Sequence, residues 1–519
     1  MKKLFRNSTS DLSSSIVVLL VALPLCLGIA LGSGAPLFSG IIAGIVGGII
    51  VGIASGSQLS VSGPAAGLTV IVATAILKLQ VFEAFLLAVV IAGVLQIILG
   101  FIKAGVIGDY IPNSVIKGML AAIGLILILK QFPHLVGYDA DFAGDESFKQ
   151  GNKENTFSGI TNAFGFITPS AIVIGAVALS ILILWEQKFM KAQKRLQGIP
   201  GPLIVVLVGT LINESFKLYQ PDYALETKHL VGLPVAAGFG EFVSFFTFPN
   251  LQYLKNPDVW MTGVTIAIVA SLETLLGIEA VDKLDSFKRV TPPNRELKAQ
   301  GLGNIVSGLL GGLPVTSVVV RSSANVSAGA KTKMSSIFHG AFMLLCVVFI
   351  PTILNKIPLS ALAAILIFTG YKLAKVSLFK EFFQKGWDQF MPFVITIVAI
   401  LATDLLIGIL VGIGVGLFYM VRSNFRSSVL IVNDDNKYLF RLRKDVSFLN
   451  KPIVKKKLEE VPKNAFVLID ATRADFIDKD VIEEINNFMV HAHLKNIKVE
   501  IKKSQFKTEH LLFNESTFN

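Results

Sequence analysis

The stretch Gly311–Lys333 reads GGLPVTSVVVRSSANVSAGAKTK and holds one arginine, Arg321, with no acidic residue beside it. Pro314 interrupts the stretch, a run rich in β-branched residues follows, and small residues then dominate as far as Ala330. Apolar segments flank the stretch on both sides. Because a charged side chain inside a membrane segment is costly and usually serves a function, Arg321 marks a candidate site.

The composition of the chain is that of a membrane protein. Of its 519 residues, 53% are hydrophobic and 16% are charged, whereas charged residues make up about 25% of a typical soluble domain. We predict an all-α polytopic fold with about fourteen transmembrane segments, each of roughly 17 to 25 mostly apolar residues. Clear examples are Leu12–Leu31, Phe38–Ala54, Phe82–Ile102, Ala171–Trp185, Val264–Ala280 and Phe393–Leu406.

Lysine and arginine gather in particular loops, which accounts for the net charge of +11 without a nucleic-acid partner. The loops after the sixth, eighth and twelfth segments are basic, and the loop after the fifth is acidic. Since basic loops stay in the cytoplasm, we predict a multi-pass protein of the inner membrane, surrounded by lipids, with both termini cytoplasmic. The residues that carry this pattern are Lys188, Lys191, Lys194 and Arg195; Lys283, Lys288, Arg289, Arg295 and Lys298; Lys372, Lys375, Lys380 and Lys385; and the acids Asp139, Asp141, Asp145, Glu146 and Glu154.

The residue types needed for metal binding or catalysis are sparse. Cys26 and Cys346 are the only cysteines and lie in apolar segments, so neither a disulfide framework nor a zinc site is expected. The six histidines are scattered, and no nucleophile stands beside a base. We therefore predict no metal site, no catalytic residue and no enzymatic activity.

The polar tail is a second domain. We place the transmembrane domain at residues 1–422 and a cytoplasmic α/β domain at 423–519. Short strand-like runs occur in the tail, and apolar residues recur at helical spacing from Asp478, which can cap that helix. The expected strands are Val429–Val432, Lys437–Leu442, Ala465–Asp470 and Ile497–Ile501.

A weak internal echo links the two halves of the membrane region. The stretch Gly56–Val72, GSQLSVSGPAAGLTVIV, also places a proline break before a short apolar helix. Paired interrupted segments in two halves point to a transporter site near the bilayer midplane. Backbone of this kind is tolerated there only if protein or a water-filled cavity satisfies its polar groups.

The two short helices are expected to bind an anion at their N-terminal ends. They would begin at Ala65–Gly67 and at Ser322–Ala324, where free N–H groups and the helix dipole attract negative charge. Small residues at both ends, including Ala65, Ala66, Ser322 and Ser323, leave room for a ligand. Arg321 would add a full positive charge. The alternative for Arg321 is a salt bridge that only stabilises packing.

Glu273 is the next charge to explain, in the apolar stretch TIAIVASLETLLGIEAV. A carboxylate at this depth can take up a proton, bind sodium or balance Arg321. It can equally form a purely structural ion pair with Arg321. Burial favours its neutral form unless a cation lies near.

At these residues the sequence resembles the SulP family of sulfate-permease-like anion transporters. The resemblance rests on VALPLCLGIALGSGAPLFSGIIAGIVGGIIVGIASGSQLSVSGPAAGLTVIV and on NRELKAQGLGNIVSGLLGGLPVTSVVVRSSANVSAGAKTK. It implies two inverted seven-segment repeats that form a core and a gate domain, usually in a homodimer. It also implies a substrate site made of Leu25, Ile29, Ala65 and Val320 with Arg321 before the tenth helix, and a coupling-ion site at Glu273 and Thr69.

Three positions depart from the pattern of some relatives. Leu25 replaces a polar residue, Ala65 an aromatic one, and Gly277 a hydroxyl that a sodium-coupled relative carries. Sodium coupling is therefore less favoured, and proton coupling or uncoupled exchange stays open. No cofactor other than a coupling Na+ or H+ is expected.

The tail resembles the STAS domain that follows such membrane regions. AFVLIDATRADFIDKDVIEEINNFM matches its central strand, loop and helix, but Lys479 and Asp480 follow Asp478 where a regulatory phosphoacceptor serine would stand. The resemblance implies a site for a soluble regulator, without phosphorylation at this place.

Together these features predict a secondary active transporter for sulfate, bicarbonate or a dicarboxylate, working by an elevator-like movement of core against gate. An anion channel or an exchanger without cation coupling remains an alternative, as does a nucleobase permease of the same fold. A membrane-anchored sensor that signals through the tail is a further alternative.

Overall fold

A computed structural model describes residues 8–141, 155–187, 190, 200–236, 239–403, 405–504 and 512–513. The chain divides into two compact units, residues 1–413 and 414–519. The boundary predicted at 422/423 falls inside the last membrane helix, α20 (Leu405–Ser427). The basic residues Lys188, Lys191, Lys194 and Arg195 and the acidic residues of 145–154 lie outside the described residues.

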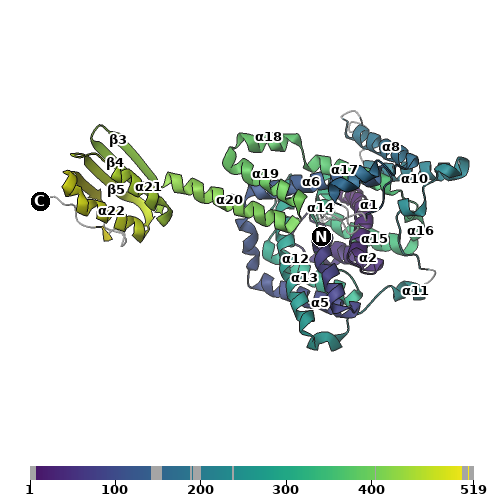
Figure 1. Ribbon diagram of the computed structural model, residues 1–519. Coiled ribbons are helices and arrows are strands. Elements are labelled where there is room, and N and C mark those ends of the chain that lie inside the picture. Colours follow the sequence, from purple (N-terminus) through teal and green to yellow (C-terminus); the bar gives the residue numbers. More distant parts are fainter. Residues whose placement is uncertain are drawn as a thin grey trace. The chain divides into compact units, whose positions relative to one another are not determined.

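The described helices of the first repeat run from α1 to α10 (Figure 1). Its third segment is short and follows a break, as the sequence predicts. A five-residue π-helical stretch, Gly47–Val51, joins α2 to α3 within the second segment. The helices are α1 (Ser8–Gly32), α2 (Leu37–Val46), α3 (Gly52–Ala54), α4 (Thr69–Leu79), α5 (Phe82–Phe101), α6 (Asn113–Leu135), α7 (Thr156–Ala163), α8 (Pro169–Glu186) and α10 (Gly201–Tyr219).

The second repeat follows the same plan, and its third segment, α14, is again short. Phe393–Leu406 is not one segment, because α19 ends at Ala402 and α20 begins at Leu405. The helices before α20 are α11 (Phe239–Ser244), α12 (Pro257–Leu284), α13 (Pro293–Leu310), α14 (Val319–Ser327), α15 (Met334–Phe349), α16 (Pro351–Leu354), α17 (Leu359–Leu373), α18 (Val376–Gln384) and α19 (Trp387–Ala402).

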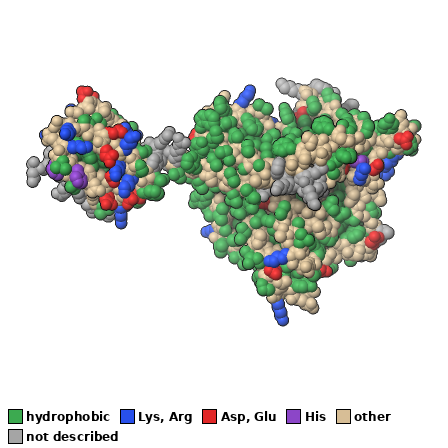
Figure 2. All heavy atoms as spheres, in the orientation of Figure 1, with side chains coloured by type: hydrophobic (Ala, Val, Ile, Leu, Met, Phe, Trp, Pro, Cys, Tyr) green, Lys and Arg blue, Asp and Glu red, His purple; other side chains and the backbone are tan. Residues whose placement is uncertain are grey.

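The described helices fit a membrane. Eight are long and apolar enough to cross a bilayer, and four shorter apolar helices accompany them. Large apolar side chains on their outer faces are exposed, such as Leu77, Phe101 and Leu211. Figure 2 shows hydrophobic side chains covering much of the visible face of this unit, with few charged ones among them. The predicted polytopic helical fold is confirmed.

The membrane helices pack in two groups. In the core half, α5 lies against α12 and α13, and α1 lies against α2, α14 and α15. In the gate half, α6 lies against α17 and α19, and α8 lies against α10 and α17. Each half takes helices from both repeats, so the groups form only when the two repeats interlock.

Glycines let α5 and α13 approach closely. A Cβ placed at Gly93 would lie 2.5 Å from the carbonyl oxygen of Gly301, and a Cβ at Gly301 would lie 2.5 Å from that of Gly93. Small residues at helix interfaces are the usual means of close packing in membranes. This contact holds α5 closely against α13.

A buried cluster of one carboxylate and two imidazoles joins the segment between the two repeats to the gate half. Asp139, just beyond the end of α6, accepts hydrogen bonds from the Nδ1 atoms of His134 and His229, each 2.5 Å away. Burial acts to raise the pKa of Asp139, but its hydrogen bonds to the two histidines outweigh this and hold the pKa below its usual value. Close by in the chain, Leu230 pairs with Pro358 at the start of α17.

The tail folds as the predicted α/β domain. Its four-stranded sheet has the order β3-β4-β5-β6, antiparallel between β3 and β4 and parallel thereafter. Asp478 caps α22 by accepting the N–H of Asp480 at 3.0 Å, and the core includes Val481, Ile482 and Ile485. The sequence pattern missed α21. The elements are β3 (Val429–Asp434), β4 (Lys437–Val446), α21 (Lys451–Glu459), β5 (Phe466–Ile477), α22 (Lys479–Ala492) and β6 (Lys498–Lys502).

Gly93→Ala or Gly301→Ala should destabilise the membrane unit, because the added methyl group would meet backbone of the facing helix. Overpacking of this kind costs about 1–3 kcal/mol. Thermal unfolding in detergent should show a lower midpoint for both variants. Gly232→Ala is the control, because no atom lies within 4 Å of a Cβ at that position; an equal loss of stability in the control would contradict this role of the close packing.

Candidate functional site

Two short strands pair inside the membrane unit, and their pairing positions the starts of the two short helices. β1 (Ser62–Pro64) pairs antiparallel with β2 (Val315–Ser317), with Gly63 opposite Thr316. β1 leads through Ala65 into a 3-10 turn, Ala66–Leu68, and α4. β2 leads through Val318 into α14. The prolines at 64 and 314 interrupt the helical pattern, and the β-branched residues after Pro314 favour the extended conformation.

Side chains form hydrogen bonds with backbone groups of this strand pair. Asn304 on α13 accepts the N–H of Val315 at 2.6 Å and donates to its carbonyl oxygen at 3.0 Å. Its side chain also donates to Gln96 of α5 at 2.6 Å. Because unsatisfied backbone groups cost several kcal/mol in hydrocarbon, Asn304 stabilises strands that lipid alone would not allow.

Neither short helix has a side-chain cap at its start. The residues that precede the first helical turns, Ala65 and Val318, carry no group that could accept a backbone N–H. In α14 the N–H of Ser322 makes the first helical bond, to the carbonyl oxygen of Val318 at 3.0 Å. The N–H groups of the preceding turn therefore remain for a ligand.

The two helix starts border one small cavity of about 40 Å³. The core half forms one wall and the gate half, through α6 and α20, forms the other. The lining residues are Ala65, Ala66, Gly67, Glu273, Leu276, Gly277 and Thr316 to Val320 from the core half, with Met119, Ile123, Leu405, Leu406 and Ile409 from the gate half.

The structure brings four of the predicted site residues together at this cavity: Ala65, Ala66, Val320 and Glu273. Two other predicted site residues, Leu25 and Ile29, are not among the lining residues and are buried on α1, a helix that packs against α14.

The predicted hydroxyl residues are also buried beside the cavity and are not among its lining residues. The hydroxyl of Ser322 accepts the N–H of Val61 at 2.9 Å, which ties α14 to β1. Ser323 donates to the carbonyl oxygen of Val320 at 2.8 Å. Thr69 is buried in the first turn of α4.

Arg321 differs in position from the prediction. The helix begins at Val319 rather than at Ser322, because the backbone turns helical directly after β2, and Arg321 therefore lies inside the first turn. Its side chain is fully buried and does not line the cavity. Nη2 lies 3.4 Å from the carbonyl oxygen of Pro64, and a Cβ at position 63 would overlap Nη1. Gly63 thus gives the guanidinium its place behind β1.

The charge of Arg321 has no carboxylate partner among the described ion pairs, and the ion pair with Glu273 that the sequence allowed is absent from that part of the chain. The Cys26 thiol lies beside the guanidinium, and the buried imidazole of His339 is close enough to feel its charge. A buried and unpaired charge is costly. The positive potential of Arg321 therefore reaches the helix starts without being neutralised by an adjacent acid.

Glu273 lines the cavity. It lies on α12 and is 8% exposed. A Cβ at Gly67 would overlap its Oε1 atom, so only glycine lets the carboxylate approach the backbone at the start of the first short helix. A negative group in this place interacts favourably with the helix dipole.

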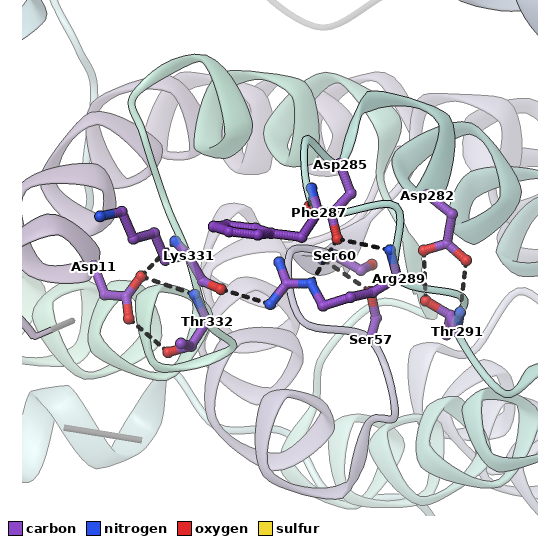
Figure 3. A network of polar contacts seen from close by, with 10 residues as sticks. All are labelled: Asp11, Ser57, Ser60, Asp282, Asp285, Phe287, Arg289, Thr291, Lys331 and Thr332. Atoms are coloured by element: carbon purple, nitrogen blue, oxygen red, sulfur yellow. Dashed lines mark hydrogen bonds and ion pairs between the residues drawn. The ribbon is translucent and has the colours of Figure 1, made fainter. Parts of the chain in front are cut away.

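Polar contacts join the first turn of α1 to the loops that follow α12 and α14, as Figure 3 shows. Asp11 on α1 accepts the N–H groups of Lys331 and Thr332 at 2.7 and 3.0 Å, in the loop after α14. Arg289, in the loop after α12, donates to the carbonyl oxygen of Lys331 at 2.8 Å and to Asp285 at 2.6 Å. These contacts tie α1, α12 and α14 together at one end of the core half.

Sequence reasoning missed the gate wall and the purpose of two glycines. Met119 and Ile123 are ordinary apolar residues of a membrane helix, so no local signal separates them from lipid-facing ones. Gly63 and Gly67 stand out in the sequence as small residues, but each makes room for a side chain of the protein itself. That fact depends on which distant residue folds against them.

Comparison with known proteins places the chain among anion transporters. The Sulfate permease family model matches residues 9–399. YvdB of Bacillus subtilis (strain 168), a putative sulfate transporter, is 24% identical over 84% of this chain and 78% of its own length. The bicarbonate transporter BicA of Picosynechococcus sp. (strain ATCC 27264 / PCC 7002 / PR-6) is 25% identical over 80% of this chain and 69% of its own length.

Solved structures share the fold. The transmembrane domain of a cyanobacterial BicA superposes with a TM-score of 0.55 at 21% identity, covering 80% of this chain and 98% of that one. Murine solute carrier 26 family member A9, in the inward-facing state, gives 0.66 at 16% identity, covering 97% and 87%. These matches confirm the predicted fold, with its helical membrane unit and its C-terminal α/β domain. The family model spans both short helices and the β1–β2 pair. This chain therefore belongs to the sulfate permease family.

Proposed function

We propose that the protein is a secondary transporter of a small inorganic anion, and that the anion binds at the starts of the two short helices. The observation that carries this proposal is the meeting of two uncapped helix starts at one cavity, in front of a buried arginine with no carboxylate partner among the described residues. Helix starts with free N–H groups are anion sites, and Arg321 adds a full charge.

The size of the cavity favours sulfate or bicarbonate over a dicarboxylate. The cavity is small, at about 40 Å³. Sulfate and bicarbonate are compact, whereas a dicarboxylate such as fumarate is longer. The names of the matched relatives, a putative sulfate transporter and a bicarbonate transporter, support this choice. Membership in the sulfate permease family argues against the nucleobase permease.

Glu273 supports coupling to a proton. Its carboxylate lies against Gly67, at a helix start that the anion would also use. Two negative charges at such close range disfavour each other, so binding of an anion favours protonation of the acid. The anion and one proton would then move together. Thr69 is buried away from the lining, so a sodium site at Glu273 and Thr69 receives less support.

The arrangement of the two halves supports an elevator-type movement. Both helix starts belong to the core half, and the β1–β2 pairing fixes them to each other. The gate half contributes only apolar side chains to the described cavity wall. An apolar wall without hydrogen bonds to the core half offers little resistance to sliding.

The assembly and membrane placement complete the proposal. We infer a homodimer in the inner membrane with cytoplasmic termini, and a tail that binds a soluble regulator. Enzymatic activity forms no part of it, because the chain belongs to a transporter family.

The test is uptake by purified protein in liposomes, with labelled sulfate and labelled bicarbonate, each with and without sodium and a pH gradient. Saturable uptake that an inward proton gradient accelerates would support the proposal. Unitary currents without counterflow would instead show a channel. Uptake of neither anion would overturn the proposed substrate class.

Arg321→Gln should reduce saturable anion uptake by at least about tenfold, or about 1.4 kcal/mol of transition-state stabilisation. The thermal midpoint should stay level or rise, because the variant removes an unpaired buried charge. Added sulfate should stabilise the wild type more than the variant. The exposed Arg295→Gln is the matched control for loss of one positive charge; uptake by Arg321→Gln equal to that of the control would remove Arg321 from the site.

Glu273→Gln should abolish the pH dependence of uptake, because the amide cannot exchange a proton. Wild-type uptake should rise as the pH on the side of entry falls. Glu279→Gln is the control on the same helix, since Glu279 pairs with Lys283 at 3.0 Å and does not line the cavity. Parallel pH profiles for wild type and Glu273→Gln would show that the coupling group lies elsewhere.

A further inference from the structure

A patch of exposed apolar side chains lies where α5 ends and the chain continues to α6. The connection contains η4 (Ala104–Tyr110), a 3-10 helix. Large apolar side chains here are between 48% and 78% exposed. The residues of this η4 patch are Phe101, Ile102, Val106, Ile107 and Tyr110. Exposed apolar surface of this kind marks a contact with another molecule or with a membrane.

The η4 patch continues the lipid-facing surface of α5. Val94 and Ile98 are 45% and 48% exposed and lie about one helical turn apart on the same face. Phe101 and Ile102 follow about one turn later. Both α5 and α6 are long and apolar enough to cross a bilayer, so η4 joins the ends of two spans at one surface of the membrane. The bilayer surface is therefore the partner that the patch fits.

Two lysines border the η4 patch. Lys103 is exposed and directly precedes η4. The ammonium group of Lys298, on α13, lies 4.8 Å from the centre of the Phe101 ring. Neither lysine forms an ion pair with an acid among the described residues. Asp109 is the only acid in the sequence from residue 101 to 113, so the two lysines leave an excess of positive charge.

The η4 patch is fixed to the core half. The N–H of Gly105 donates to the side-chain oxygen of Asn294, at the start of α13, at 2.9 Å. A Cβ at Gly105 would lie 2.7 Å from the same oxygen, so only glycine allows this approach. η4 also packs against α12. The patch and Lys298 therefore keep a constant arrangement, because both are attached to α13.

We propose that the η4 patch binds an anionic phospholipid at the membrane surface, with Lys103 and Lys298 holding the phosphate of its headgroup. The apolar side chains of the patch then lie at the boundary between headgroups and acyl chains, as those of interfacial helices do. Lysines beside a membrane surface attract anionic headgroups, and their long stems let the ammonium group reach the phosphate. The inference concerns lipid binding, so it holds whichever anion the protein transports.

Fluorescence quenching by nitroxide lipids tests the proposal in the full-length protein. Ala104→Cys, made in a Cys346→Ser background, places a bimane label on η4, because the remaining Cys26 is buried. The labelled parent protein is reconstituted in liposomes with rising amounts of phosphatidylglycerol or phosphatidylcholine that carry a nitroxide near the top of one acyl chain. Phosphatidylglycerol should reach half of the maximal quenching at a mole fraction at least about threefold lower than phosphatidylcholine, since each lysine near the surface attracts anionic lipid.

Charge variants separate the lysines from the apolar patch. Lys103→Gln/Lys298→Gln should respond equally to the two lipids, and Lys103→Arg/Lys298→Arg should keep the preference for phosphatidylglycerol. Unchanged quenching by phosphatidylcholine in the Gln variant would show that η4 still lies at the membrane. The preference should also shrink between about 0.01 M and 0.15 M salt, as the screening length falls from about 30 Å to about 8 Å.

Two matched controls use sites outside the patch. Lys463→Gln/Lys495→Gln removes two exposed positive charges from the tail domain and should leave the preference unchanged. A bimane at Leu211→Cys reports from the outer face of α10, where Leu211 is 65% exposed. Both lipids should quench that label equally.

Four results would overturn the proposal. Equal quenching by both lipids in the labelled parent would show a bilayer contact without a headgroup site. Absence of quenching by either lipid would show that protein, such as a second copy of the chain, covers the patch. A preference that survives in Lys103→Gln/Lys298→Gln would place the headgroup site elsewhere. Loss of the preference on adding glycerol phosphate would show a site for a soluble phosphate ester instead of a lipid.

Discussion

The pairing of β1 with β2 inside the membrane is the constraint on which the rest of the site depends. Extended backbone at this depth needs a partner for every N–H and carbonyl group. Each three-residue strand supplies part of what the other needs, and Asn304 supplies more. Because of this pairing, two helices from separate repeats can begin at the same place. Without it, the helix starts and their free N–H groups would have no fixed relation.

The same strand pair also determines where the side chains of Arg321 and Glu273 lie. Gly63 in β1 makes space for the Arg321 guanidinium, and Gly67 after it makes space for the Glu273 carboxylate. The arginine lies behind the strand and the acid lies at the cavity. Backbone thus separates the two charges, which keeps them from forming the salt bridge that would neutralise both.

Most of the fold could be predicted from the sequence because its signals are local and repeated. Long apolar segments, two proline breaks and the helical spacing after Asp478 each predict an element that the structure contains. The start of α14 was placed three residues too late, since Val319 and Val320 belong to the same β-branched run as the strand and pairing with β1 decides where that strand stops. The gate wall gave no signal, because Met119 and Ile409 look like any other membrane residue until α6 and α20 are packed beside the helix starts.

The two repeats share one strand pair, and this bears on how many anions the proposed site can hold. Each repeat contributes a short helix, but the two helix starts border one cavity and face one buried guanidinium. Under the proposed function, doubling the helical unit has therefore not doubled the number of anion-binding places. A single protomer would carry one anion in each cycle, so the turnover of an assembly would scale with the number of chains and not with the number of repeats.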